Sequence, residues 1–144
     1  MGCVYFIKHI GVDGVKIGCT KEDNPSKRLR SFNTYSPNGV ELIDYFKCKN
    51  YNEVEEKIHA KYKSYRMNGE FFDISGKYID YIIKTYSIHE VLTNDGVVLF
   101  SGNNNCCIKF LKNKGYKKEF HPFFDDNYYN NGIDYLTIER SINV

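Results

Sequence analysis

The hydrophobic and polar positions of the first half of the chain predict a small antiparallel sheet. Residues 3–10 and 15–19 are rich in β-branched and aromatic side chains, and the glycine-containing segment 11–14 between them is typical of a turn. Together these segments predict a β-hairpin. Residues 40–47 alternate well enough between apolar and polar side chains to predict a third strand.

Three helices are predicted between and after these strands. Asn24 and Pro25 suit the cap and the first position of a helix that runs through Phe32. Asn52 is the expected cap of a second helix, whose acidic first turn suits the positive end of the helix dipole. Residues 77–86 have helical spacing, which predicts a third helix with an inner face made of Ile79, Ile82 and Ile83.

The character of the chain changes after residue 86. We therefore expect two parts, a domain at residues 1–86 and a small accessory α/β region at residues 87–144. In the second part, two short strands at 89–93 and 97–100 enclose the sequence Asn-Asp-Gly, which is a good hairpin turn. The expected fold class of the whole chain is α+β, because hairpin strands and helices follow one another in both parts.

The rest of the accessory region is expected to hold one helix and one strand. The helix is predicted at 106–114, with one of the adjacent cysteines Cys106 and Cys107 facing in and the other facing out. Residues 121–132 are rich in Asn, Asp and aromatic side chains, which predicts a loop. The last strand is expected at 133–138.

Composition places the chain among globular proteins of a reducing compartment. Hydrophobic residues make up 42% and aromatic residues 16% of its 144 residues, which favours a packed core over disorder. The five cysteines include no CxxC pair, so free thiols are expected rather than a disulfide framework or a zinc ribbon. Neither a secretory signal nor an apolar run of membrane length is visible, so we expect an intracellular, cytoplasmic protein.

Five short motifs follow one another in a fixed order within residues 3–74. They are Val4-Tyr5, Lys16-Ile17-Gly18, Arg28, His59 and Gly69-Glu70-Phe71-Phe72. In this order and at these spacings, the chain resembles the GIY-YIG nuclease superfamily, in particular its phage- and virus-type branch. Two positions depart from the family pattern: Cys3 stands where the first motif has glycine, and Lys16 stands where the second motif has tyrosine.

The resemblance implies a three-stranded antiparallel sheet flanked by helices, and a metal-dependent endonuclease that hydrolyses phosphodiester bonds. It assigns catalysis to Tyr5, Lys16, Arg28 and His59. It assigns the binding of one Mg²⁺ (or Mn²⁺) ion to Glu70, a carboxylate ligand of the kind that hard cations prefer.

The residue types suit this chemistry. On paired strands, Tyr5 and Lys16 can lie side by side on one face. Tyr5 could orient or deprotonate the attacking water, the latter if neighbouring cations lower the pKa of its phenol. Arg28 offers a planar fork for phosphate oxygens. His59 could position Tyr5 or relay a proton.

Basic side chains around these motifs are the expected contacts to nucleic acid, with DNA as the expected substrate. The candidates are Lys8, Lys27, Arg30 and Arg66. In the accessory region, lysines alternate with aromatic residues between positions 109 and 120. That segment suits either a second surface that binds the substrate or a docking or dimer surface. The sequence is compatible with a monomer or a weak dimer.

Two other classes of function remain open from the sequence. The altered first motif and Lys16 also suit a nucleic-acid-binding module that retains the fold without the activity. The accessory region also suits a viral interaction protein whose tail binds a partner. No P-loop, Rossmann glycine pattern or nucleophile-elbow motif is present to suggest different chemistry.

Overall fold

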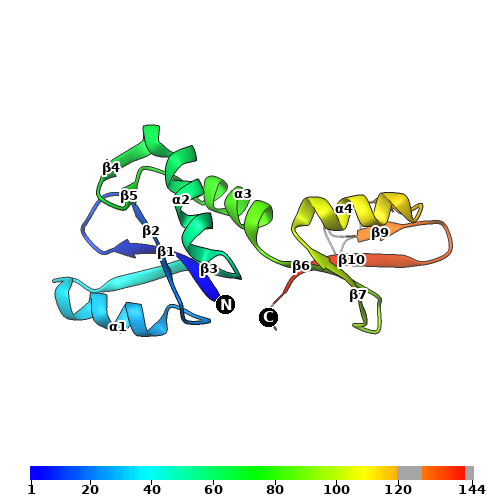
Figure 1. Ribbon diagram of the computed structural model, residues 1–144, viewed down its shortest axis with the longest axis horizontal. Coiled ribbons are helices and arrows are strands. Elements are labelled where there is room, and N and C mark those ends of the chain that lie inside the picture. Colours follow the sequence, from blue (N-terminus) through cyan, green and yellow to red (C-terminus); the bar gives the residue numbers. More distant parts are fainter. Residues whose placement is uncertain (120–127, 142–144) are drawn as a thin grey trace. The chain divides into compact units, whose positions relative to one another are not determined.

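The computed structural model describes residues 1–119 and 128–141, and the chain divides into two compact units, Met1–Ile83 and Lys84–Val144 (Figure 1). The division lies inside helix α3 (Gly76–Tyr86), close to the expected boundary after residue 86. Each unit has its own antiparallel sheet with at least one helix, so the architecture of each is α+β.

Unit 1 has a five-stranded antiparallel sheet in the order β3-β1-β2-β5-β4. The strands are β1 (Gly2–His9), β2 (Val15–Thr20), β3 (Val40–Cys48), β4 (Arg66–Asn68) and β5 (Phe71–Phe72). The expected sheet had three strands. The expectation missed β4 and β5, because strands of two or three residues are too short to show an alternating pattern.

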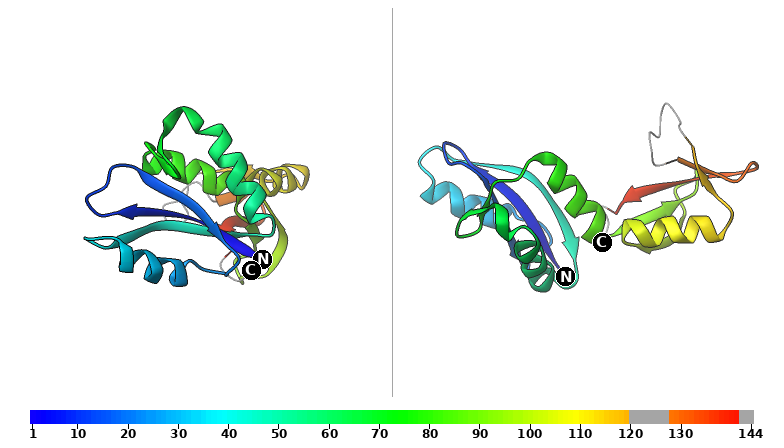
Figure 2. Two further views of the ribbon diagram at one scale, coloured as in Figure 1. Left: turned by 60° about the vertical axis from the view of Figure 1, so that its left-hand side comes forward. Right: turned by 90° about the horizontal axis from the view of Figure 1, so that it is seen from above.

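The helices of unit 1 lie on both faces of this sheet. They are α1 (Ser26–Tyr35), α2 (Tyr51–Lys61), the 3₁₀ turn η1 (Lys63–Tyr65) and α3. Two views show α1 on one face of the sheet and α2 on the opposite face (Figures 1 and 2). Ile79, Ile82 and Ile83 of α3 are buried, which confirms the predicted inner face.

Two predicted helix caps are shifted. Pro25 occupies the N-cap position of α1 rather than its first turn, while Asn24 accepts a hydrogen bond from the Ser26 amide. In α2 the N-cap position belongs to Asn50, and Asn52 is already helical. Helix α2 begins at Tyr51, one residue before Asn52, so the Asn52 side chain does not cap the helix and instead accepts a hydrogen bond from Cys19.

Unit 2 has a second five-stranded antiparallel sheet, in the order β7-β6-β10-β9-β8. Its elements are β6 (His89–Leu92), β7 (Val98–Gly102), α4 (Asn104–Asn113), β8 (Lys117–Lys118), β9 (Tyr128–Asn130) and β10 (Tyr135–Arg140). The predicted loop is wrong at Tyr128–Asn130, which pair with β10 as a strand. Residues 121–127 of that loop lie outside the described residues.

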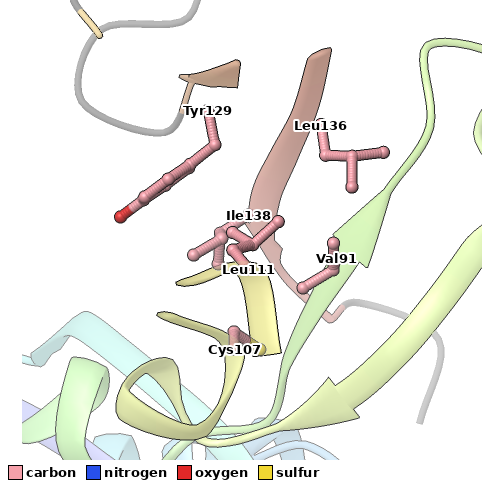
Figure 3. Packing of buried hydrophobic residues seen from close by; sticks show 6 residues of the cluster. All are labelled: Val91, Cys107, Leu111, Tyr129, Leu136 and Ile138. Atoms are coloured by element: carbon pink, nitrogen blue, oxygen red, sulfur yellow. The ribbon is translucent and has the colours of Figure 1, made fainter. Parts of the chain in front are cut away.

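Helix α4 and the second sheet enclose a separate core. Its buried residues are Val91, Cys107, Leu111, Tyr129, Leu136 and Ile138, shown together in Figure 3. Cys107 is fully buried while Cys106 is exposed, which confirms that one of the two cysteines faces in. All five cysteines belong to the described residues and are free thiols. No described helix combines the length and the hydropathy that a membrane span requires.

Candidate active site

The first and second motifs meet on one face of β1 and β2. Tyr5 is paired with Gly18, and Ile7 with Lys16, so Tyr5 and Lys16 share a face, as expected. A Cβ atom on Gly18 would lie 2.5 Å from the Tyr5 hydroxyl and 2.6 Å from its Cζ atom. Because the glycine of the second motif has no side chain, the Tyr5 ring can lie across β2 at this position.

Lys16 and Glu70 form an ion pair at this site. The Lys16 Nζ atom lies 2.8 Å from the Glu70 Oε2 atom, and their side chains are 17% and 43% exposed. The pairing of β2 with β5 places Lys16 opposite Phe71, directly after Glu70. The backbone carbonyl of Glu70 also accepts a hydrogen bond from the Ile17 amide, which fixes the turn that carries the carboxylate.

Phe32 of α1 covers the same face of the sheet. Its ring lies 6.3 Å from that of Tyr5 and 5.5 Å from that of His9, and the Lys16 ammonium lies 5.1 Å from its centroid. Such aromatic and cation–π contacts exclude water from one side of the lysine. His9 is enclosed between Phe32 and Phe71, and its buried Nε2 atom lacks a hydrogen-bond partner within the described residues.

His59 of α2 is hydrogen-bonded to the backbone of β2. Its Nε2 atom lies 2.9 Å from the Ile17 carbonyl oxygen, and because a carbonyl can only accept, Nε2 is the donor. Its ring also packs 4.9 Å from that of Phe72. Nε2 thereby holds α2 against β2, and the roles expected for His59, positioning Tyr5 or relaying a proton, stay predictions.

Glu55 connects His59 to a cysteine that the sequence did not single out. The Glu55 Oε1 atom lies 3.5 Å from His59 Nε2, and Oε2 accepts a hydrogen bond from the Cys19 thiol at 2.6 Å. Cys19 also donates to Asn52 at 3.3 Å. The sequence signal available for this cluster was the spacing of Glu55 and His59, one helical turn apart.

Burial dominates the electrostatics of Tyr5. Desolvation by burial, helped by the charge of Glu70 and opposed by the charge of Arg28, raises the pKa of the phenol to about 12. The expected acidification of Tyr5 by cations is therefore wrong, because the desolvation of a side chain that is 2% exposed outweighs the nearby arginine. Tyr5 keeps its proton at neutral pH.

Helix α1 presents basic side chains beside this site. Arg28 is exposed, and its effect on the pKa of Tyr5 shows that the guanidinium lies within electrostatic reach of the phenol. Lys27 and Arg28 line a pocket of about 250 Å³ together with residues after β2, and Lys27 and Arg30 line a second one. Two of the expected nucleic-acid contacts, Lys27 and Arg30, are thus gathered on one helix beside Arg28.

The remaining two basic candidates lie elsewhere. Lys8 is exposed on the face of β1 opposite Tyr5, because side chains alternate along a strand. Arg66 donates from Nε to the Gly69 carbonyl and lies 5.6 Å from the centroid of Phe72. Its observed contacts therefore stabilise the turn that carries Glu70.

The described residues place a single carboxylate, Glu70, beside Lys16 at the exposed end of this site. Nowhere in 1–119 and 128–141 do three His, Cys, Asp or Glu side chains gather in a way that could hold a metal ion. A closed, fully protein-ligated metal cage is thus absent from this part of the chain. The donors present suit a hard cation that takes most of its ligands from water and from a phosphate group.

Comparison with known proteins places the chain in a family. Residues 2–87, which include all of the candidate site, match the T5orf172 domain. The chain is also similar to "Uncharacterized protein 460R" of Invertebrate iridescent virus 6, with 32% identity over a match that covers 63% of this chain and 43% of that protein. It thus spans less than half the length of that relative, and no solved structure matches it. Because the matched region is more than half of the sequence, the chain belongs to the T5orf172 domain family.

Proposed function

We propose that the protein is a metal-dependent endonuclease of the GIY-YIG type that hydrolyses phosphodiester bonds in DNA. The observation that carries the proposal is the arrangement of Tyr5 and Lys16 on one sheet face, with Glu70 bonded to Lys16. T5orf172 domains occur in phage and viral proteins and are associated with GIY-YIG-like and HNH-type nucleases, which supports the proposal.

The side chains of the site would position the substrate and the attacking water. Tyr5 keeps its proton at neutral pH because its pKa is raised, so it donates a hydrogen bond that orients the water. Lys16 and Arg28 would bind the non-bridging phosphate oxygens, where negative charge develops as the water attacks. His59 and Glu55 would hold α2 against β2, the strand that carries Lys16.

Glu70 is the residue that would hold Mg²⁺ or Mn²⁺. Its Oε2 atom contacts Lys16, and Oε1 is a further hard oxygen donor on a partly exposed carboxylate. When bound, the cation would supply Lewis-acid stabilisation of the charge on the phosphoryl group. We expect weak metal binding without substrate, because the lysine ammonium offsets the charge of the one carboxylate.

The test is a cleavage assay with supercoiled plasmid, single-stranded DNA and RNA, in Mg²⁺ or Mn²⁺ and in EDTA. We expect metal-dependent cleavage by the wild type, and a loss of about 100-fold or more in Glu70→Gln, because a metal ligand contributes several kcal/mol to the transition state. Glu56→Gln is the matched control, since Glu56 is a carboxylate of α2 outside the site.

Circular dichroism would establish that Glu70→Gln is folded, which we expect because a half-exposed ion pair contributes only about 0–1 kcal/mol to stability. Full activity in Glu70→Gln would contradict the assignment of the metal ligand. Cleavage that persists in EDTA would contradict metal dependence, and cleavage of RNA alone would redirect the proposed substrate.

One observation favours a second candidate, a nucleic-acid-binding module without activity. Glu70 is already bonded to Lys16, and the pKa of Tyr5 is raised, so neither side chain is poised as a free base. Binding of DNA by the folded wild type, with no cleavage in either metal, would favour this second function over the first.

A further inference from the structure

Helix α4 has one buried face and one face made of hydrogen-bond donors. Cys107 and Leu111 are buried in the core of unit 2. The opposite face is exposed and carries Asn105, Lys109, Lys112 and Asn113. Lys109 and Lys112 lie three residues apart, which places them one above the other on a helix surface.

This face carries positive charge without the usual compensation. No acidic residue occurs from Gly96 to Lys118, a segment that includes five lysines. Within the residues that the structure describes, neither Lys109 nor Lys112 forms an ion pair. Helix α2 shows the ordinary alternative, because its exposed Lys57 is paired with Glu53 at 3.2 Å, one turn away.

Both ends of α4 are held in place. The Asn103 side chain caps the first turn by accepting from the Cys106 amide. At the other end, Gly115 has a φ of 84°, its amide donates to the Lys112 carbonyl, and the Tyr116 amide donates to the Leu111 carbonyl. This is a Schellman motif, which turns the chain directly into β8. Lys114, Lys117 and Lys118 therefore follow α4 at fixed positions.

Two stacked aromatic rings, those of Phe100 and Phe110, hold α4 against β7 behind its exposed face. The Phe100 and Phe110 rings are stacked, with centroids 4.8 Å apart and an interplanar angle of 13°. The Lys114 ammonium lies 5.8 Å from the centroid of Phe110. These contacts fix the rotation of α4 against β7, so its lysines are presented on a preorganised surface rather than on a flexible tail.

We propose that this exposed face of α4 binds the phosphate backbone of the nucleic acid substrate and makes unit 2 a second, non-catalytic grip. Amide and ammonium donors in a line, without carboxylates between them, suit an extended row of phosphate oxygens. The proposal rests on the proposed function, in that nucleic acid is taken to be the ligand. It identifies no base sequence, because phosphate contacts do not read bases.

The test measures DNA binding by the full chain in EDTA, where cleavage does not interfere. Fluorescence anisotropy would compare the wild type with Lys109→Gln/Lys112→Gln on a labelled duplex and on the corresponding single strand. We expect about tenfold weaker binding in the double variant. For the duplex, the plot of log affinity against log salt should become less steep by about 1.8, or about 0.9 for each lost phosphate contact.

Two control variants separate the possible causes. Lys49→Gln/Lys77→Gln removes the same charge from exposed positions in unit 1 and should leave binding within about twofold of the wild type. Lys109→Arg/Lys112→Arg retains the charge and should retain binding. Equal losses in both Gln pairs would overturn the proposal, because net charge alone would then explain them. Unchanged affinity and salt dependence in Lys109→Gln/Lys112→Gln would also overturn it.

The outcomes also distinguish this proposal from the proposed function. A wild type that binds and cuts DNA, with no effect of Lys109→Gln/Lys112→Gln, would overturn the role of α4 alone. A wild type that binds neither probe would overturn both. Displacement of bound DNA by polyglutamate at a concentration comparable with that of a DNA competitor would overturn the choice of nucleic acid over an acidic protein.

Discussion

At the scale of single residues, the glycine of the second motif, Gly18, and the tyrosine of the first, Tyr5, depend on each other for space. Gly18 has no side chain, and the Tyr5 ring occupies the volume that a Cβ atom would need. A motif match indicates that both residues are present, and the register of β1 with β2 explains why they occur together. The chemistry of Tyr5 was less accessible from sequence, because its pKa depends on a burial that α1 and the sheet create jointly.

We expect Gly18→Ala to destabilise the fold by about 1–3 kcal/mol, because the new methyl group overlaps the Tyr5 ring. Urea denaturation would measure this loss. In a Tyr5→Ala background the same substitution should cost much less, since the obstructing ring is gone. Tyr5→Phe should give no such relief, because the Cζ atom itself lies 2.6 Å from the place that the alanine methyl group would take. Additive effects of Gly18→Ala and Tyr5→Ala would argue against this steric account.

At the scale of elements, long periodic segments were predictable and very short strands were not. β-Branched and aromatic content identified β1 and β2, alternation identified β3, and the isoleucine spacing identified the inner face of α3. β5 and β8 have two residues each, so no period can be read from them. The contact of Cys19 with Glu55 was missed because 36 sequence positions separate them, and only the packing of α2 on β2 brings them together.

The link between α2 and β2 should be visible in the reactivity of Cys19. Burial, together with the hydrogen bond to Glu55 and the charge of that carboxylate, raises the pKa of this thiol to about 12. A raised pKa keeps the thiol protonated at neutral pH, and alkylation should accelerate as the pH increases toward that value. Glu55→Gln removes the negative charge, so the pKa should fall and alkylation at mildly alkaline pH should become faster.

Alkylation followed by peptide mass spectrometry would give the rate at Cys19 for the wild type and each variant. Glu56→Gln, which changes the neighbouring carboxylate, should leave that rate unchanged. A slower rate in Glu55→Gln would contradict the sign of this electrostatic effect.

At the scale of the whole molecule, the two units have separate cores. The sequence indicated two parts from the change in character after residue 86, and motifs were available only for the first. In unit 2 the core forms between α4 and the second sheet, including β9, which residue composition alone had suggested to be loop. The pairing of β9 with β10 depends on contacts between strands, which a single short segment cannot reveal.

Leu111→Ala should test this separation. Removing a fully buried leucine from the core of unit 2 should cost about 2–5 kcal/mol there. We expect hydrogen exchange to accelerate in β6 and β10, while β1 and β3 keep their protection. Ile58→Ala, which truncates a fully buried residue of unit 1, should show the opposite pattern. Uniform acceleration in both sheets for either variant would instead indicate one cooperative unit.

The exposed thiol of Cys106 allows a fluorescent dye to be attached selectively to the native protein. Burial raises the pKa of the other four cysteines, Cys3, Cys19, Cys48 and Cys107, and so suppresses their nucleophilic form. A brief maleimide treatment at neutral pH should therefore tag Cys106 first, without any engineered site. Because Cys106 lies in the first turn of α4, the fluorescence of the attached dye should change when a ligand binds near that helix.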